Sequence, residues 1–419
     1  MEIRLAYGKT GLDIEIPDHI HTEVVEPSYV DGLADQEAAV AAALAKPIQH
    51  PPLKEAVRSD QKVAIIFSDI TRATPYHILV PALLEALAHL PDQHILFFCA
   101  TGTHRPASQE ELITILGADI VKRFRIVQND CTKDEDYLDL GITSSGNKVR
   151  LNKEMLDCDL RILTGFIEPH FFAGFSGGGK ALMPGMAHVE TIRHNHAIRM
   201  LDNPKARWGY TEGNPLWEDV MEAAEFAPPL FLLNISMNRN KEITGVFAGD
   251  LRAAHRKGCA FAKKTAMVAL DEPFDIVISS NSGYPLDLNV YKSVKGMSAA
   301  ERIIRKGGSI IMAAECWDGI PAGSDYEKIL GSSNSVPGLM SFIKEHEPEL
   351  RDTWQVYFQA MIQMKSDVWL YSGLDESTVK STHLKPVKDI GKLVDQLVQK
   401  HGASTRICVL PEGPHTIPY

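Results

Sequence analysis

The most constraining feature of this chain is an alternation of short apolar segments with segments of helical periodicity. Residues 62–68 (KVAIIFS) are typical of a buried strand, and residues 78–90 are typical of an amphipathic helix. The order repeats with an apolar segment at 94–100 (HILFFCA) and a helix-like segment at 108–117, which opens with Ser108 as a predicted cap. Strands that alternate with helices in this way predict βαβ units around a mostly parallel sheet.

A second alternating set begins near residue 270. Residues 274–280 (FDIVISS) predict a strand, residues 291–306 predict a helix, and residues 307–315 (GGSIIMAAE) predict a further strand. At 419 residues the chain is too long for one ordinary core. The predicted fold class is therefore α/β, with two α/β domains, mostly parallel sheets and an active-site cleft between them.

The boundary between the two predicted domains falls near residues 263–273, where the first alternating set ends. This placement gives an N-terminal α/β domain of residues 1–265 and a C-terminal α/β domain of residues 266–419. We expect the first domain to carry most of the reactive side chains and the second to close the cleft.

Composition narrows the partners that the chain can have. The formal net charge is −11, and an acidic surface of this kind argues against nucleic acid and anionic membranes as partners. The six cysteines contain no C-x-x-C pair, which argues against disulfides and a thiolate zinc site. The sequence contains neither a transmembrane-length apolar run nor a signal-peptide core, and this predicts a cytoplasmic protein. No feature of the sequence indicates an oligomeric state.

Polar loops follow three of the predicted strands, at the edge where open α/β sheets bind ligands. Asp69 opens the first loop, His104 lies in the second, and His170 lies in the third. Any one loop could simply cap the following helix, whereas three loops at one edge favour a site. The loops comprise residues 69–75, 101–106 and 168–172.

A glycine-rich segment follows the third loop. Residues 174–181 fit the P-loop spacing G-x-x-x-x-G-K, in which consecutive amides and Lys180 could cradle a phosphate. Ala181 stands where a P-loop NTPase needs a hydroxyl for magnesium, and the loop does not follow its strand directly. An ordinary NTPase is therefore disfavoured, and a P-loop-like nucleotide-binding protein remains an alternative. The three consecutive glycines are Gly177, Gly178 and Gly179.

Histidines near this segment are candidate bases or metal ligands, because imidazole serves both purposes near neutral pH. His194 and His196 are two residues apart, so on a helix only one of them can face a site. The H-E-x-x-H signature of zinc proteases is absent from the sequence. A zinc hydrolase built on His104, His170 and His196 stays open as a third interpretation.

Two lysines mark the start of a helix in the second predicted domain. Lys292 and Lys295 are three residues apart and therefore share one helical face. Such a pair is usually a solvated basic face. Its position after a strand and at a helix start makes an anion-binding role the alternative.

Taken together, these motifs resemble the nickel-dependent lactate racemase family, and the resemblance covers the whole chain. The most specific part is the stretch that runs from Glu-Pro-His to Gly-Gly-Gly-Lys. The matching motifs, in order, are D-x-T-R with a nearby proline (69–75), TGTHRP (101–106), EPHFFAGFSGGGK (168–180), Asn-His (195–196) and Y-x-x-x-K-G (291–296).

The resemblance implies a cofactor. Members of the family carry a nickel-pincer nucleotide, a pyridinium mononucleotide that holds nickel through carbon and sulfur. By resemblance, Lys180 is the residue joined covalently to it and His196 is the nickel ligand. Specialised maturation enzymes build this cofactor, so they are the transient protein partners implied. The residues expected to help hold the nucleotide are Asp69, Thr71, Gly177, Gly178 and Gly179.

The resemblance also implies a reaction, the interconversion of the enantiomers of a small 2-hydroxy acid. A hydride transfer to an electrophilic ring avoids the carbanion that direct proton removal from C2 requires. His104 and His170 are then the paired acid/base residues, because each enantiomer presents its hydroxyl to a different side. Arg72 and Lys295 are expected to hold the substrate carboxylate or hydroxyl. Further expected substrate-binding residues are Tyr291, Lys292 and Trp354.

Lactate is the leading substrate that the resemblance suggests. Lys292 departs from the pattern, because lactate-specific relatives have a neutral amide at this place. A second cation there favours a larger or more acidic 2-hydroxy acid, such as malate or a sugar acid, as the alternative substrate.

Overall fold

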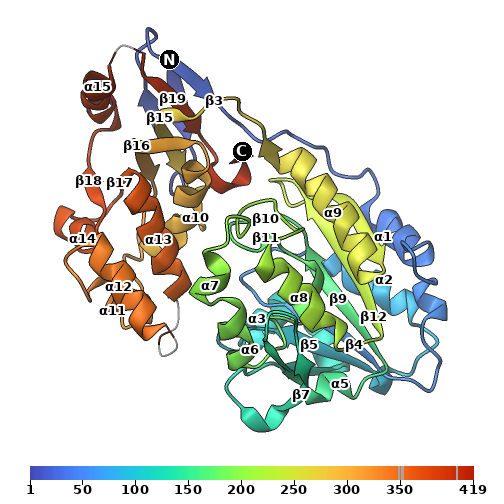
Figure 1. Cartoon of the computed structure of the whole chain (residues 1–419). Coiled ribbons are helices and arrows are strands. Elements are labelled where there is room, and N and C mark those ends of the chain that lie inside the picture. The colour runs from blue at the N-terminus through green and yellow to red at the C-terminus, as the bar shows by residue number, and fades with distance from the viewer. Residues whose placement is uncertain (348–349, 351–352, 403) are drawn as a thin grey trace. The chain divides into compact units, whose positions relative to one another are not determined.

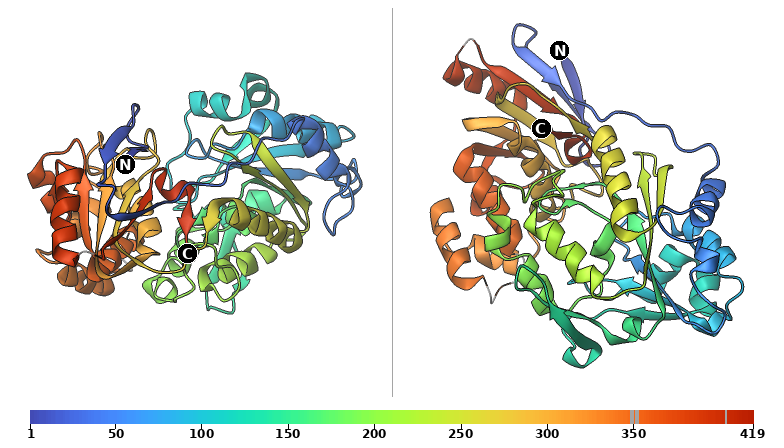
Figure 2. Two further views of the ribbon diagram at one scale, coloured as in Figure 1. Left: turned by 90° about the horizontal axis from the view of Figure 1, so that it is seen from above. Right: turned by 45° about the vertical axis from the view of Figure 1, so that its right-hand side comes forward.

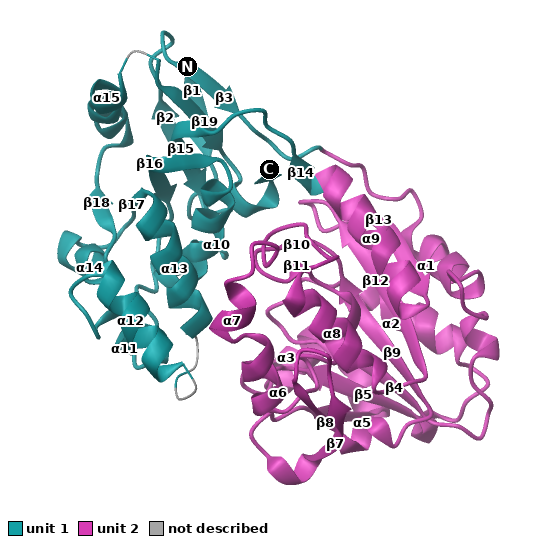
Figure 3. Cartoon of the chain, viewed as in Figure 1, with its two compact units in different colours: residues 1–28, 266–419 teal, residues 29–265 magenta. Residues whose placement is uncertain are grey.

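Strand pairing divides the chain into two compact units. The computed structural model describes residues 1–347, 350, 353–402 and 404–419. Unit 2 comprises residues 29–265, and unit 1 comprises residues 1–28 together with 266–419 (Figure 3). Each unit contains a six-stranded sheet with helices, and parallel pairing dominates in both. The predicted α/β class with two domains is confirmed.

The N-terminal segment belongs to unit 1, although the sequence predicts it in the first domain. β3 (His21–Val24) pairs in parallel with β19 (Arg406–Leu410) near the other end of the chain. β1 (Glu2–Leu5) and β2 (Leu12–Glu15) form a hairpin whose isoleucine and leucine side chains enter the core of unit 1. An edge strand takes its hydrogen bonds from whichever sheet edge it meets, and periodicity along the sequence does not reveal which edge that is.

Unit 2 is built on a sheet with the strand order β13-β12-β9-β4-β5-β6. Its inner strands are apolar and almost wholly buried, as parallel strands covered on both faces must be. β13 runs antiparallel to β12, and the other neighbours are parallel. The strands are β4 (Val63–Ser68), β5 (Ile95–Ala100), β6 (Arg125–Gln128), β9 (Leu160–Phe166), β12 (Leu230–Met237) and β13 (Ile243–Gly249).

Helices cover both faces of this sheet (Figures 1 and 2). α1, α2 and α3 pack their apolar side chains on one face, together with alternate residues of the strands. The predicted cap is confirmed, because Ser108 and Glu111 form a capping box at the start of α3. α8 and α9 lie over the glycine-rich segment, on the other face. The principal helices of the unit are α1 (Gln36–Ala45), α2 (Tyr76–Ala86), α3 (Gln109–Leu116), α4 (Ala118–Arg123), α8 (Pro215–Glu225) and α9 (Leu251–Ala266).

Short elements connect β6 to β12 in unit 2. An antiparallel hairpin follows β6, and a pair of two-residue strands flanks residues 171–173, with the first strand inside the third polar loop. These elements are β7 (Tyr137–Ile142), β8 (Lys148–Asn152), α5 (Lys153–Leu156), β10 (Pro169–His170), β11 (Gly174–Phe175), η4 (Gly178–Ala181), α6 (Val189–Asn195) and α7 (Ile198–Leu201).

Unit 1 is built on a parallel sheet with the strand order β18-β17-β16-β15-β19-β3. Its further strands are β15 (Phe274–Ser280), β16 (Ile304–Ala313), β17 (Asp367–Tyr371) and β18 (Lys385–Val387), and β14 (Met267–Val268) pairs separately with β20 (Ile417–Pro418). Its helices are α10 (Val290–Glu301), α11 (Asp325–Leu330), α12 (Val336–His346), α13 (Thr353–Lys365), α14 (Glu376–Ser381) and α15 (Ile390–His401). Within the described part of the chain, no helix combines the length and apolarity needed to cross a bilayer.

Candidate active site

Three neighbouring strands of unit 2 end at the same edge of its sheet. β9, β4 and β5 are adjacent and parallel, so the loops that leave their carboxyl ends lie along one edge. Asp69 and Arg72 follow β4, His104 follows β5, and His170 follows β9. This is the edge at which open α/β sheets bind ligands.

Asp69 and His104 form a hydrogen-bonded pair across two of these loops. The Nδ1 of His104 donates to Oδ2 of Asp69 over 2.6 Å, and the hydroxyl of Thr71 donates to Oδ1 over 2.6 Å. Burial acts to raise the pKa of Asp69, but the bonds from His104 and Thr71 outweigh it and hold the pKa below its usual range. Asp69 is buried, whereas the His104 side chain is 51% exposed. An ionised aspartate therefore orients an accessible imidazole.

His170 sits at the end of the short strand β10. The backbone amide of Ala173 donates to its Nδ1 over 3.3 Å, which assigns the lone pair of the neutral ring to Nδ1 and the proton to Nε2. Its ring stacks on Phe171, with the ring centroids 5.1 Å apart, and meets Phe172 edge-on at 4.6 Å. Aromatic packing and one backbone bond thus fix the orientation of this histidine.

The glycine-rich segment is held tightly against β12 and α8. The amide of Gly178 donates to Oδ1 of Asn234 over 2.7 Å, and a Cβ on Gly177 would lie 2.4 Å from the same oxygen. Both glycines have positive φ, at 74° for Gly177 and 58° for Gly178. A Cβ on Gly179 would lie 2.9 Å from the Val220 carbonyl oxygen. Close packing therefore requires each glycine, and the Gly178 amide is already bonded within the protein.

His255 of α9 supports this segment, and no sequence motif marks it. Its Nε2 donates to the Ser176 carbonyl oxygen over 2.9 Å, and a Cβ on Gly178 would lie 2.8 Å from its ring. The ring stacks parallel to Trp217, with centroids 6.2 Å apart. Burial lowers the pKa of His255 to about 4, so the imidazole is neutral at physiological pH. Asn234 and His255 are the supporting residues that the sequence did not reveal.

Lys180 lies at the end of the glycine-rich segment, over the ring of Phe172. Its Nζ is 5.7 Å from the centroid of that ring. Burial, with a smaller contribution from the nearby positive charge of Arg72, lowers the pKa of Lys180 to about 7. Burial thus favours the neutral, nucleophilic form of the Lys180 amine.

His196 closes α6 and packs on the same phenylalanine. Its ring meets Phe172 edge-on at 5.1 Å, and its Nδ1 lies 3.2 Å from the Ile192 carbonyl oxygen, which accepts its proton. Burial, assisted by the charge of Lys180, lowers the pKa of His196 to about 3. The ring is therefore neutral, with its lone pair on Nε2 as a metal ligand requires. Phe172 thus gathers Lys180 and His196 into one cluster.

The remaining predicted residues belong to unit 1. Asn289 caps α10 by accepting the amide of Lys292 over 3.1 Å. Tyr291 packs edge-on against Tyr326, with centroids 5.1 Å apart. Lys292 is exposed, whereas Lys295 is half-buried on the same helix. Trp354 is half-buried on α13, next to Gln355, whose amide donates to the Tyr291 carbonyl oxygen.

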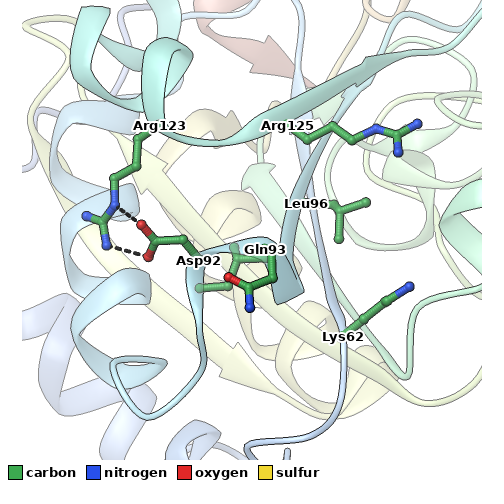
Figure 4. Close-up of a pocket in the computed structure, with 7 residues that line it drawn as sticks. Lys62, Asp92, Gln93, Leu96, Arg123 and Arg125 are labelled. Atoms are coloured by element: carbon green, nitrogen blue, oxygen red, sulfur yellow. Dashed lines mark hydrogen bonds and ion pairs between the residues drawn. The ribbon is translucent and has the colours of Figure 1, made fainter.

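A hollow of about 470 Å³ lies at the opposite end of the unit 2 strands and contains none of the predicted site residues (Figure 4). Of the three basic residues that line it, Arg123 is already bonded to both carboxylate oxygens of Asp92. Among the described residues, no three His, Cys, Asp or Glu side chains are grouped as a metal site would require. The zinc-hydrolase interpretation therefore finds no three-ligand group in this part of the chain.

Fold and site together define an α/β enzyme of two units, with oriented histidines and a buried lysine of lowered pKa. Models of the lactate racemase N-terminal domain and C-terminal domain match residues 7–209 and 270–417. The lactate racemase of Lactiplantibacillus plantarum is 37% identical over 98% of both chains, and that of Thermoanaerobacterium thermosaccharolyticum is 35% identical over 99% of this chain and 98% of its own. The chain belongs to the lactate racemase family, a family of isomerases, and the resemblance seen in its motifs is confirmed.

Solved structures agree with this assignment. The lactate racemase apoprotein from Thermoanaerobacterium thermosaccharolyticum superposes with a TM-score of 0.94 at 34% identity and covers all of both chains. A Thermotoga maritima protein covers 93% of this chain and 100% of its own, with a TM-score of 0.69 at 19% identity. The second likeness shows the fold alone.

Proposed function

We propose that this protein interconverts the enantiomers of a small 2-hydroxy acid, with lactate as the leading substrate. The supporting relatives are lactate racemases at 35% and 37% identity over nearly the whole chain. The observation that carries the proposal is the pair His104 and His170. They stand on loops from β5 and β9, the two strands that flank β4, and each has one ring nitrogen committed to a hydrogen bond.

The neutral rings of the two histidines carry their proton on different nitrogens. Asp69 accepts the Nδ1 proton of His104, so the neutral ring offers the Nε2 lone pair as a base. Ala173 donates to Nδ1 of His170, so the neutral ring carries its proton on Nε2 and can donate a hydrogen bond there. In the proposed reaction His104 takes the substrate's hydroxyl proton, and His170, once it is protonated to the imidazolium, returns a proton to the oxygen from the other side. A racemase needs this pairing, because the enantiomers present the hydroxyl to different sides.

A nickel-pincer nucleotide fits the cluster around Phe172. Burial favours the neutral amine of Lys180 that a covalent link requires, and His196 has a neutral imidazole whose Nδ1 is committed to Ile192. When bound, the nucleotide supplies an electrophilic ring for hydride exchange at C2 of the substrate. The proposed holders of the group are Lys180 and His196, with Gly177, Gly178 and Gly179 shaping the loop.

Substrate binding follows the family pattern in this proposal. Arg72 is the carboxylate partner next to Lys180, since its charge acts on the pKa of that lysine. Lys295, Tyr291 and Trp354 are proposed as the contribution of unit 1. If the exposed Lys292 also contacts substrate, a second anionic or polyhydroxylated end is favoured, and malate or a sugar acid becomes the alternative substrate.

We further propose that the protein works in the cytoplasm and meets cofactor-maturation enzymes transiently. The test is intact-mass and nickel analysis of protein purified from its native cell, with lactate racemisation assayed on the same sample. A mass adduct that maps to Lys180, stoichiometric nickel and racemisation are expected together. Lys180→Ala should lack the adduct and the activity while remaining folded. An unmodified, nickel-free protein that racemises lactate would reject the cofactor assignment.

A further inference from the structure

A buried carboxylate lies behind the proposed nickel ligand. Asp219 of α8 is 2% exposed and Asn195, which directly precedes His196, is 1% exposed. The amide of Asn195 donates to Oδ2 of Asp219 over 2.8 Å and is also within 3.1 Å of the Leu216 carbonyl oxygen. The last residue of α6 is thus tied to α8 from inside the protein.

The same carboxylate accepts three more neutral donors from the β7–β8 hairpin. The hydroxyls of Thr143 and Ser145 donate to Oδ1 over 2.6 and 2.7 Å, and the amide of Asn147 donates to Oδ2 over 2.8 Å. Asn147 also donates to the Thr191 carbonyl oxygen of α6 over 3.1 Å. Asp219 is therefore the common acceptor at which the hairpin, α6 and α8 meet.

This junction lies directly next to His196, so it can control the position of the proposed nickel ligand. α6 has only seven residues and His196 is its C-terminal cap, a place where an unsupported short helix frays. A metal ligand must hold its ring in one orientation, and the groups behind the ligand usually provide that constraint. Ile192, one turn earlier, accepts the Nδ1 proton of His196, so a shift of α6 would move both the ring and its anchor.

We propose that Asp219 is a positioning residue for His196. Through Asn195, Asp219 fixes the end of α6 and thereby holds His196 in the orientation that keeps nickel bound. This inference rests on the proposed function, because it assumes that His196 is the nickel ligand. Asp219 touches neither substrate nor cofactor in this scheme. Its effect appears in the rate at which nickel leaves, rather than in attachment of the nucleotide to Lys180.

A matched control exists on the same helix. Glu222, three residues from Asp219, accepts the amide and the hydroxyl of Ser144 over 2.8 and 2.6 Å. Glu222 thus ties the same hairpin to α8, and none of its hydrogen bonds described here reaches α6. Glu222→Gln therefore tests whether anchoring of the hairpin alone accounts for any effect.

The experiment compares wild type, Asp219→Asn, Asn195→Ala and Glu222→Gln, all purified with the cofactor loaded. Intact mass gives the adduct on Lys180, and nickel per adduct is followed over time in excess chelator. Asp219→Asn and Asn195→Ala are expected to keep the adduct but lose nickel about tenfold faster. Glu222→Gln is expected to lose it at the wild-type rate. Thermal unfolding of the adduct-free variants reports any general loss of stability.

Each outcome decides a separate point. If wild type has neither adduct nor nickel, the proposed function fails. If wild type has both and the two variants release nickel at its rate, the positioning role is wrong. If Glu222→Gln loses nickel as fast as the two variants do, the positioning role is also rejected, because anchoring of the hairpin rather than of α6 would then explain the faster loss. Should Asp219→Asn fail to fold, Asn195→Ala decides, since it leaves the contacts between Asp219 and the hairpin in place.

Discussion

At the scale of single residues, burial determines which side chains are reactive. Lys180 and His196 pack around Phe172, and burial lowers the pKa of both, to about 7 and about 3. The charged form of each group is disfavoured because the surrounding protein solvates it poorly. A nucleophilic amine and a neutral ligand can therefore coexist at neutral pH.

Lys180 in adduct-free protein should react with cyanate in a way that follows this pKa. Only the neutral amine reacts, so labelling of Lys180 should rise with pH, reach half of its maximum near pH 7 and level off about one pH unit higher. Peptide mass spectrometry measures the labelling at this site. Arg72→Ala should move the Lys180 midpoint to higher pH, because the repulsive charge that lowers its pKa is gone. A labelling midpoint for Lys180 at the ordinary lysine value would contradict the prediction.

Asp69→Asn should mainly lower kcat for racemisation. The amide cannot accept the His104 proton as the carboxylate does, so the base loses its orientation, and a loss of about 10²-fold is expected. Thr71→Val removes one donor to Asp69 but leaves the His104 bond, so its loss should be smaller. Kinetics with both lactate enantiomers and nickel analysis measure the effect. A fall in nickel content rather than kcat would return Asp69 to the cofactor-binding role predicted from sequence.

At the scale of elements, the glycine-rich segment shows how close packing specifies sequence. Asn234 of β12 and His255 of α9 contact it from two sides, and both contacts leave no room for a Cβ. The segment that fits a P-loop by spacing is thus a packed turn, in which the Gly178 amide bonds to a side chain. This packing fixes the backbone from which Lys180 extends.

Gly178→Ala should destabilise unit 2 more than Gly102→Ala does. Both positions have positive φ, at 58° and 57°, so both substitutions carry a similar backbone penalty of about 1 kcal/mol. A Cβ at Gly102 meets its nearest atom at 3.7 Å, an ordinary contact, whereas one at Gly178 lies 2.8 Å from His255. Steric strain should add about 1–3 kcal/mol. Thermal and urea unfolding measure the difference, and equal losses would show that the contact relaxes freely.

At the scale of the whole molecule, each unit contains a hydrophobic core cluster of its own. The core of unit 1 includes side chains from both ends of the sequence, because the N-terminal hairpin and β3 complete it. Ile3, Leu5, Ile14, Ile16 and Ile20 are all buried there. At about 1.5–3 kcal/mol for each buried aliphatic side chain, this segment contributes as much as the whole stability of a typical domain.

Deletion of residues 1–28 should therefore unfold unit 1 and spare unit 2. Hydrogen exchange by peptide mass spectrometry should show loss of protection across residues 266–419, with residues 29–265 close to the intact protein. Residues 29–265 expressed alone should fold, whereas residues 266–419 alone should not. If the truncated chain keeps its hydrogen-exchange protection in both units, the N-terminal segment does not contribute to the stability of unit 1.

The sequence alone determined the α/β class, most strands and the main motifs. Parallel strands buried on both faces must be apolar, so they can be recognised as apolar segments of the sequence. The reactive residues follow the strand ends in short local motifs, so they can be recognised in the same way. The capping box at Ser108 was predictable for the same reason, since its partners are three residues apart.

Only the tertiary structure decided which distant residues support the site. His255 is 79 residues from Ser176, Asn234 is 56 from Gly178, and Asp219 is 24 from Asn195. No local sequence pattern predicts such contacts, because the order of the strands in the sheet and the packing of the helices determine which polar side chains come together. The pairing of β3 with β19 has the same origin. Burial, which sets the pKa of Lys180 and His196, is likewise a property of the folded chain and not of any segment within it.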